Sequence, residues 1–457
     1  MLKRDFLILF VISLLIRVAL FMVISVHPEK YYSDSDSHDY EDIALNMMDH
    51  GAFSDDITPP YTPDLYRTPT YPVLITIIYS LTGRSVSAVI LFHVLVGALS
   101  AALMIPLADA LNLSRRVGWL AGIVLAIDPL IDLTTFQLIT ETVFVDFLLL
   151  AVLLLAVYFK KKDLRWLAGS AVLFGVASLT RPIDQYLPVA LLPLFFIAGG
   201  KLQFRDVWKG ALMFLVISTI VTYSWAYRNY AQAHLWTLSA IGDVNLLYYR
   251  AMEVVAEEED LSEDEALTQL EQEVAVEVES GHLDRAQEIE LMHDKAIGIF
   301  AQYPLTTLKV HAKGFVKVIA NPGFDLVCIM LETKNIEFDA QGNMNGCSSS
   351  GEDGLVGQIV GKLSQMTWVE KSVAVLEMVI LAGLYLGTLI AVWKLLRDRR
   401  WFLLYFLLVP VAYFSVLSAG GESVSRFRIP FIPFLAILMG IAFTEVYFHA
   451  NEKLVNE

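Results

Sequence analysis

Apolar stretches separated by short polar segments recur along most of the 457-residue chain. An α-helix needs about twenty apolar residues to cross the hydrocarbon layer of a membrane, and lipid leaves unpaired backbone amides without partners, so such stretches must be helical. The pattern predicts an all-α polytopic membrane protein. We expect ten spans, at residues 6–26, 85–110, 117–136, 140–159, 164–180, 184–200, 208–227, 372–396, 401–418 and 428–448.

The charges of the loops predict how this bundle crosses the membrane. Short loops rich in lysine and arginine remain in the cytoplasm, and the loops at 115–116, 160–165 and 397–400 have this composition. We therefore expect an inner-membrane protein with both termini in the cytoplasm and two longer loops, 27–84 and 228–371, on the outer side.

Hydrophilic residues gather on that outer side, and no internal repeat of the kind found in transporters is visible. This predicts a catalytic platform that faces outward. Within the first outer loop, 71–81 is apolar but too short to span, so we expect a re-entrant or interfacial helix there. The expected parts are an N-terminal transmembrane catalytic module at 1–227, an extracytoplasmic helical loop domain at 228–371 and C-terminal transmembrane helices at 372–457.

One segment carries most of the net charge of −16. Between Ala251 and Lys295 there are sixteen acidic residues and two basic ones. We expect an acidic, solvated helical face at 253–280. A second helix further on, with lysines at 309, 313 and 317, suits contact with anionic membrane lipids. No basic patch interleaved with aromatic residues stands out, which argues against a nucleic-acid partner.

Three aspartates lie where the first span leaves the membrane. Asp34, Asp36 and Asp39 precede or open a short amphipathic helix, which is predicted to begin at Ser37 and to stop at Gly51. An aspartate before a helix is a common N-cap, but only one of the three can fill that position. A carboxylate at this point can also act as a general base towards an acceptor hydroxyl.

Arginines at the outer ends of the spans suit a phosphate that a lipid holds at headgroup depth. The planar guanidinium fork matches phosphate oxygens. For each arginine taken alone, the alternative is an interfacial side chain that extends to water. The candidates are Arg67, Arg181 in Leu-Thr-Arg-Pro, and Arg426 and Arg428 in Ser-Arg-Phe-Arg-Ile-Pro.

Several charged residues lie inside the apolar spans. Arg17 is near the middle of the first span, where its burial costs roughly 2.5–3.5 kcal/mol, so it should face the bundle and pair with an acid. Asp128, Asp132, Glu141 and Asp146 straddle the junction of the third and fourth spans. Glu141 is a candidate to orient the base, to bind acceptor or to pair with Arg17; a purely structural ion pair is the alternative.

The two cysteines, Cys328 and Cys347, both fall in the second outer loop. A disulfide forms readily in an extracytoplasmic compartment, and two free thiols are the alternative. The histidines are scattered without the spacing of a metal site, although clustered aspartates could hold a divalent cation.

The first outer loop resembles a known family. Asp36-Ser37-His38-Asp39-Tyr40 has the Asp-x-x-x-Tyr form of the first periplasmic loop in family 39 glycosyltransferases of the GT-C superfamily, which include the protein O-mannosyltransferases and the lipid A aminoarabinose transferase. Many members have an acid directly after the first aspartate, whereas this chain has Ser37, so Asp34 or Asp39 could take that role. The segments 66–72, 140–142, 180–182 and 426–430 are also similar to family sequences at equivalent points of the chain.

The resemblance implies a GT-C bundle that moves a hexosyl or pentosyl group from a polyprenyl-phosphate donor to an acceptor hydroxyl on the periplasmic face, with inversion. The acceptor would be a glycan, a lipid or a protein, and no cofactor would be required. The implied catalytic residues are Asp36 as general base with Asp34, Asp39, Tyr40 and Glu141, and the implied donor-phosphate ligands are Arg67, Tyr66, Arg181, Arg426 and Arg428.

Two other functions fit the same pattern. A lipid-linked glycan polymerase or ligase shares the membrane bundle and the arginines but usually has its catalytic loop late in the chain. A non-enzymatic transporter or flippase for a lipid carrier would also need the membrane bundle and the arginines. The glycosyltransferase hypothesis requires Asp36 and the outer arginines to converge on one pocket.

Overall fold

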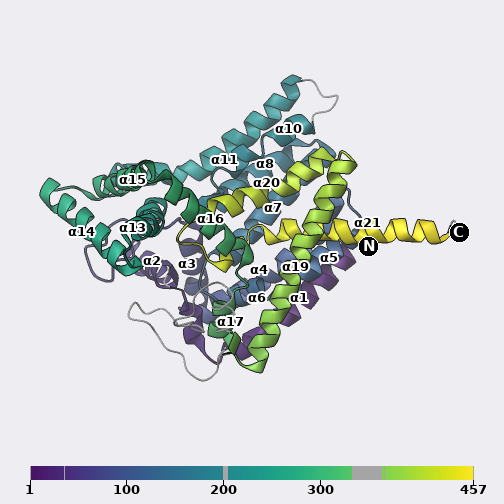
Figure 1. Cartoon of the computed structure of the whole chain (residues 1–457), viewed down its shortest axis with the longest axis horizontal. Helices are drawn as coiled ribbons and strands as arrows, with labels where there is room; N and C mark the ends of the chain where they lie inside the picture. Colours follow the sequence, from purple (N-terminus) through teal and green to yellow (C-terminus); the bar gives the residue numbers. More distant parts are fainter. Residues whose placement is uncertain (1, 35, 199–203, 332–362, 365, 456–457) are drawn as a thin grey trace.

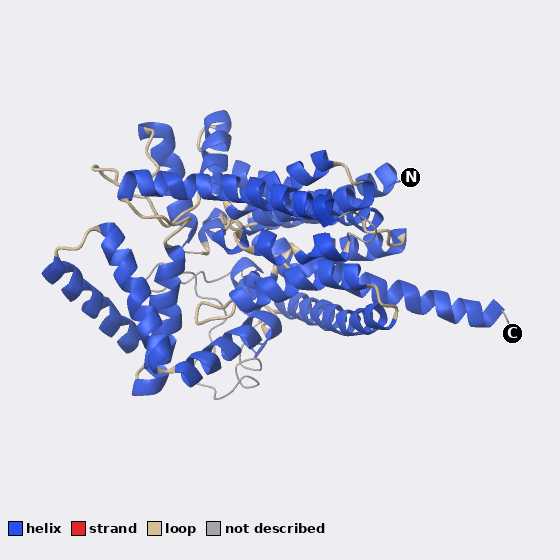
Figure 2. Ribbon diagram, turned by 90° about the horizontal axis from the view of Figure 1, so that it is seen from above, coloured by secondary structure: helices blue, strands red, loops and turns tan. Residues whose placement is uncertain are grey.

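The computed structural model of the chain describes residues 2–34, 36–198, 204–331, 363–364 and 366–455. Every regular element in these ranges is a helix, and the apolar helices pack side by side into a bundle (Figure 1, Figure 2). The prediction of an all-α polytopic membrane protein is confirmed.

Five of the described helices are long and apolar enough to cross a membrane, and each coincides with a predicted span. They are α1 (Leu2–Ile24), α4 (Val86–Ala110), α7 (Glu141–Lys161), α11 (Phe204–Ala233) and α19 (Trp368–Arg397). Three other predicted spans coincide with α8 (Leu164–Ser178), α20 (Trp401–Leu417) and α21 (Ile432–Val455), whose apolar parts are shorter.

The remaining two predicted spans are interrupted by local caps and prolines. The span expected at 117–136 becomes α5 (Arg115–Ile127) and α6 (Pro129–Thr134). Asp128 separates them because its side chain accepts a hydrogen bond from the Ile131 amide at 3.0 Å and so caps α6. The span expected at 184–200 is divided into the 3-10 helix Pro182–Asp184, α9 (Leu187–Ala190) and α10 (Pro193–Ile197), each with a proline in its first turn.

Arg17 confirms the expectation of a buried ion pair inside the bundle. Its fully buried guanidinium lies 2.8 Å from the Asp132 carboxylate and donates a hydrogen bond to the Leu125 carbonyl at 3.1 Å. A Cβ on Gly97 of α4 would lie 2.9 Å from the Arg17 Nε atom, so the glycine makes room for this side chain. Asp132, and not Glu141, is therefore the acid that neutralises Arg17.

The first outer loop contains the two predicted helices. α2 (Asp36–His50) ends at Gly51, whose φ of +66° is readily adopted by glycine. α3 (Thr70–Thr82) packs against α2 through buried tyrosines and aliphatic residues.

The second outer loop forms a group of helices with its own apolar core. α13 (Met252–Glu259), α14 (Glu263–Gly281) and α15 (Arg285–Gln302) surround that core, and α16 (Pro304–Ala320) leads to α17 (Phe324–Leu331) at an angle of 50°. These loop helices lie at the end of the bundle opposite to both chain termini (Figure 1, Figure 2). The arrangement agrees with the predicted threading; which side of the membrane each end faces stays a prediction.

The lysines of α16 have carboxylate partners within the protein, and their contact with membrane lipids stays a prediction. Lys309 and Lys313 pair with Glu257 of α13, and Lys317 lies 3.9 Å from Glu253. Their main partners are thus carboxylates of the neighbouring helix, since α16 packs against α13.

Candidate active site

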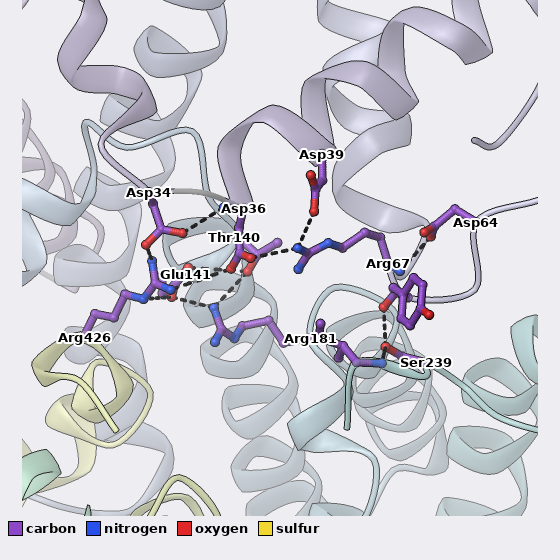
Figure 3. Close-up of polar contacts among 12 residues, drawn as sticks. Asp34, Asp36, Asp39, Asp64, Arg67, Thr140, Glu141, Arg181, Ser239 and Arg426 are labelled. Carbon is purple, nitrogen blue, oxygen red and sulfur yellow. Dashed lines mark hydrogen bonds and ion pairs between the residues drawn. The ribbon is translucent and has the colours of Figure 1, made fainter. Parts of the chain in front are cut away.

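Charged side chains from five segments of the chain meet at the end of the bundle that the loop helices cover (Figure 3). Each segment begins or ends a helix, so its backbone can change direction and aim a side chain inward. The segments contribute Asp34, Asp36 and Asp39 at the start of α2, Arg67 before α3, Thr140 and Glu141 at the start of α7, Arg181 after α8 and Arg426 between α20 and α21.

Arg67 joins two of the aspartates. One of its terminal nitrogens lies 2.8 Å from Asp36 and 2.6 Å from Asp39. Its guanidinium also lies 5.1 Å from the centre of the Tyr40 ring, a cation–π contact that fixes its plane. The Nε atom of Arg67 is buried and makes no hydrogen bond within the described part of the chain.

Arg426 contacts three carboxylates from the side of the cluster opposite to Arg67 (Figure 3). It pairs with Asp34 and lies 3.6 Å from Asp36, while its Nε atom is 3.4 Å from Glu141. It thereby joins the first outer loop to the start of α7. Asp36 lies within 4 Å of both Arg67 and Arg426, and among the described residues it is the only one of the three aspartates that bridges these two arginines.

Glu141 lies at the buried, inner side of the site. Its side chain is 2% exposed and pairs with Arg181 at 2.6 Å, and Arg181 also donates to the Thr140 hydroxyl at 2.9 Å. The Asp36 side chain, in contrast, is 33% exposed. A molecule at the surface can therefore contact Asp36 but not Glu141, and the buried Glu141 is suited to hold the arginines in position.

Hydrogen bonds tie the segments together. The Thr68 hydroxyl donates to the Thr180 carbonyl at 3.1 Å, which keeps Arg67 near Arg181. Gln137 donates to the Ser33 hydroxyl at 2.8 Å, which keeps the aspartates near the start of α7. The distances between the charged groups are therefore set by the surrounding backbone.

Asp34 and Asp36 have opposite shifts of pKa. Burial raises the pKa of Asp34, and the neighbouring Arg426 offsets only part of that rise. Burial would also raise the pKa of Asp36, but Arg67 and Arg426 together lower it further than burial raises it, so its pKa lies below the ordinary aspartate value. Asp36 is thus ionised at neutral pH, and Asp34 takes up a proton more readily.

Two predicted phosphate ligands lie elsewhere. The Arg428 side chain is fully buried and pairs with Glu377 of α19, so it is not part of the cluster. The Ser425–Arg428 segment is a 3-10 turn with about three residues per turn, so residues two apart point in different directions. The guanidinium of Arg285 in α15 lies 4.9 Å from the centre of the Tyr66 ring, and the Tyr66 carbonyl accepts a hydrogen bond from the Ser239 hydroxyl.

The structure adds residues that the sequence reasoning did not include. Asp64 accepts a hydrogen bond from the Arg67 amide at 2.7 Å, and burial raises the pKa of Asp64 to about 6. Thr140 positions Arg181 as described above. The sequence did contain an indication of this role for Asp64. It precedes Arg67 by three residues, and at such short spacings an aspartate side chain can accept a hydrogen bond from a backbone amide.

The remaining predictions concern cysteines and metals. Cys328 in α17 is disulfide-bonded, and Cys347 lies outside the described residues. Among the residues with a described position, no group of three or more His, Cys, Asp or Glu side chains has the arrangement of a metal site. That the protein requires no cofactor stays a prediction.

Comparisons with known proteins agree with this architecture. Residues 66–225 match the family model described as dolichyl-phosphate-mannose-protein mannosyltransferase. This segment contains Arg67, Glu141 and Arg181, whereas the aspartates and Arg426 lie outside it. No curated protein matches the chain significantly by sequence.

One solved structure shares the fold of the whole chain, and a second is similar at a lower level. The oligosaccharyltransferase AglB from Archaeoglobus fulgidus aligns with 99% of this chain at 13% identity and a TM-score of 0.50, and the chain spans 52% of the length of that protein. ArnT from Cupriavidus metallidurans aligns with 93% of this chain and 76% of its own length, at 14% identity and a TM-score of 0.41. Residues 66–225 are thus similar to that mannosyltransferase family, and the chain as a whole shares the fold of the oligosaccharyltransferase AglB.

Proposed function

We propose that the protein transfers a sugar from a polyprenyl-phosphate carrier to an acceptor hydroxyl on the extracytoplasmic face, with Asp36 as general base. One observation carries this proposal: an ionised, partly exposed carboxylate lies between two arginines at the end of the bundle. A base and a phosphate-binding group are the two functions that this transfer needs.

The arginines suit the phosphate of the donor. Arg67, Arg181 and Arg426 supply three guanidinium groups against the four carboxylates of Asp34, Asp36, Asp39 and Glu141. The lipid tail would hold the phosphodiester at headgroup depth, where these arginines can turn from the carboxylates to its oxygens. The archaeal oligosaccharyltransferase of the same fold was solved with a dolichol-phosphate.

The transfer itself is a single displacement. The acceptor oxygen attacks the anomeric carbon and its proton passes to Asp36, while the bond between that carbon and the phosphate oxygen breaks. Polyprenyl phosphate leaves, and its added negative charge is stabilised by the arginines. When the arginines turn to the phosphate, Asp36 loses cationic partners. Its pKa then rises, which makes it a stronger base at the moment of reaction.

Purified protein in liposomes tests the proposal. The sugar is first identified by mass spectrometry of cell-envelope glycans from a deletion strain, and the matching labelled undecaprenyl-phosphate sugar is then supplied with envelope acceptors. We expect label to move to an acceptor with release of undecaprenyl phosphate. Translocation of an intact carrier without any cleavage would instead support a flippase, and addition of whole lipid-linked glycans would support a polymerase or ligase.

Arg426 offers a test of donor binding alone. We expect Arg426→Gln to weaken the binding of undecaprenyl phosphate by roughly 10- to 100-fold, because a hydrogen bond to a charged group contributes about 1.5–3 kcal/mol. Arg426→Lys keeps the positive charge but lacks the planar guanidinium fork, so its affinity for undecaprenyl phosphate should lie between those of the wild type and of Arg426→Gln. The measurement is lipid binding to detergent-purified protein by native mass spectrometry.

Arg84→Gln is the matched control, because Arg84 forms a surface pair with Asp49 outside the cluster. It should bind the lipid with wild-type affinity. If Arg426→Gln also bound like the wild type, the assignment of Arg426 to the phosphate would be wrong.

A further inference from the structure

A pocket of about 550 Å³ lies next to the charged cluster, on the side of the loop helices. One wall is the segment 421–424, which precedes Arg426 by two residues, and the opposite walls come from residues 244–253 and from the first turns of α14. A cavity of this size suits a small molecule or a few residues of a larger one.

The pocket is in direct contact with the structure around the site. A Cβ on Gly421 would lie 2.4 Å from the Tyr249 carbonyl, so the backbone of 421–424 is packed tightly on the π-helical turn Leu246–Ala251. Burial raises the pKa of Tyr249, and the carboxylates of Asp36 and Asp34 raise it further. Tyr249 therefore lines the pocket and is close enough to the aspartates to feel their charge.

The lining of this pocket is strongly acidic. The Glu422 carboxylate pairs with the Arg250 guanidinium at 2.8 Å, and the Glu253 carboxylate lies 3.9 Å from the Lys317 ammonium group. The three other acids, Glu263, Asp264 and Glu271, have no basic side chain within 4.0 Å among the residues that the structure describes. A concave surface lined by one sign of charge concentrates ions of the opposite sign.

The geometry of the acids and tyrosines is well defined. Ser262 and Glu265 form a capping box at the start of α14, which holds Glu263 and Asp264 at the pocket. Tyr248 also lines it, beside Tyr249. Aromatic faces together with carboxylates are the surroundings that ammonium and guanidinium groups prefer.

We propose that this pocket binds a positively charged group of the acceptor, an ammonium or guanidinium that lies a short distance from the hydroxyl to be glycosylated. The inference rests on the proposed function, because that function anchors the donor in the membrane through its lipid. The pocket on the loop-helix side is then left for the acceptor. The acidic segment 253–280 thereby acquires a role in acceptor selection.

Direct binding of acceptor-like probes to the protein tests this proposal without any sugar donor. The probes are two pairs of matched acceptors: the capped peptides Lys-Ser-Lys and Glu-Ser-Glu, and the trimers of glucosamine and of N-acetylglucosamine. We expect the detergent-purified wild type to bind a cationic member at least tenfold more tightly than its partner, as measured by calorimetry. The pair that shows the larger preference identifies a peptide or a glycan source of the charge.

Two triple variants assign the effect to the pocket. Glu263→Gln/Asp264→Asn/Glu271→Gln should lose the preference. Glu259→Gln/Glu279→Gln/Glu290→Gln removes the same charge from exposed positions outside the pocket and should keep it. All six carboxylates are exposed, so both variants should fold, with unchanged binding of undecaprenyl phosphate as the check.

Equal binding of cationic and matched probes by the wild type would overturn the inference, and so would an equal preference in both triple variants. Since these measurements need no sugar transfer, they are independent of the liposome assay that tests the proposed function. In that assay the pocket variant should raise the KM for a cationic acceptor and leave kcat unchanged; a loss confined to kcat would also overturn the inference.

Discussion

Asp36→Asn is expected to reduce kcat/KM for sugar transfer by roughly 10²–10⁴-fold, the usual contribution of a general base. Asparagine keeps the shape of the side chain but cannot accept the acceptor's proton. Arg67 would retain its contact with Asp39, and Arg426 its contacts with Asp34 and Glu141, so the cluster should stay assembled.

Donor binding separates a loss of the base from a loss of structure. Asp36→Asn removes a negative charge next to the phosphate site, so undecaprenyl phosphate should bind as tightly as to the wild type or more tightly. Asp49→Asn, at the other end of α2 on a surface pair with Arg84, is the matched control and should remain active. Full activity of Asp36→Asn at normal expression would exclude Asp36 as the base.

The lowered pKa of Asp36 also gives the direction of the pH dependence. A carboxylate whose pKa is depressed is ionised at every pH above that value and becomes protonated only as the pH falls through it. The acidic limb of the kcat/KM profile should therefore lie below about 3.9, the ordinary aspartate value. A limb near pH 6 would point instead to a group with a raised pKa, such as Asp64.

Breaking the Arg17–Asp132 pair should give the largest loss of stability. Arg17→Met leaves the Asp132 carboxylate buried without its cation, and removing one partner of a buried pair costs about 3–5 kcal/mol. The measurement is unfolding of the purified protein in mixed detergent micelles, followed by tryptophan fluorescence.

The double variant tests the reason for that loss. Arg17→Met/Asp132→Leu removes both charges, so it should be clearly more stable than Arg17→Met alone. A double variant less stable than either single variant would show that the pair contributes by itself, beyond neutralising two buried charges. Arg84→Gln, which breaks an exposed pair, should change stability by less than about 1 kcal/mol.

The sequence predicted the helices and most of the site, because both depend on local patterns. The length of the apolar stretches identified the spans. The predicted order of membrane crossings placed Asp36, Arg67 and Arg426 at the same level of the membrane, so their convergence followed from the topology. The breaks at Asp128 and Pro193 were missed, since a cap or a proline inside an apolar run changes periodicity little.

The pairing of charges was the part that local patterns could not provide. Arg17 has Asp132 and not Glu141 as its partner, a choice that depends on the rotation of three helices about their axes. Arg428 was grouped with Arg426 because the two are neighbours in sequence, but Glu377, far along the chain, decides its position. The pocket likewise joins segments from residues 244 to 424, and no single stretch carries its signature.

The position of Arg426 near the end of the chain has a consequence for biogenesis. Among the described residues that precede α20, the arginines that pair with Asp36, Asp39 and Glu141 are Arg67 and Arg181, so these two are available as counterions before Arg426 is translated. With Asp34 there are four carboxylates against two arginines, and the excess of negative charge is reduced from two to one when the turn after α20 is inserted and Arg426 reaches Asp34. The turn after α20 thus completes a charged cluster whose acidic members were translated long before it.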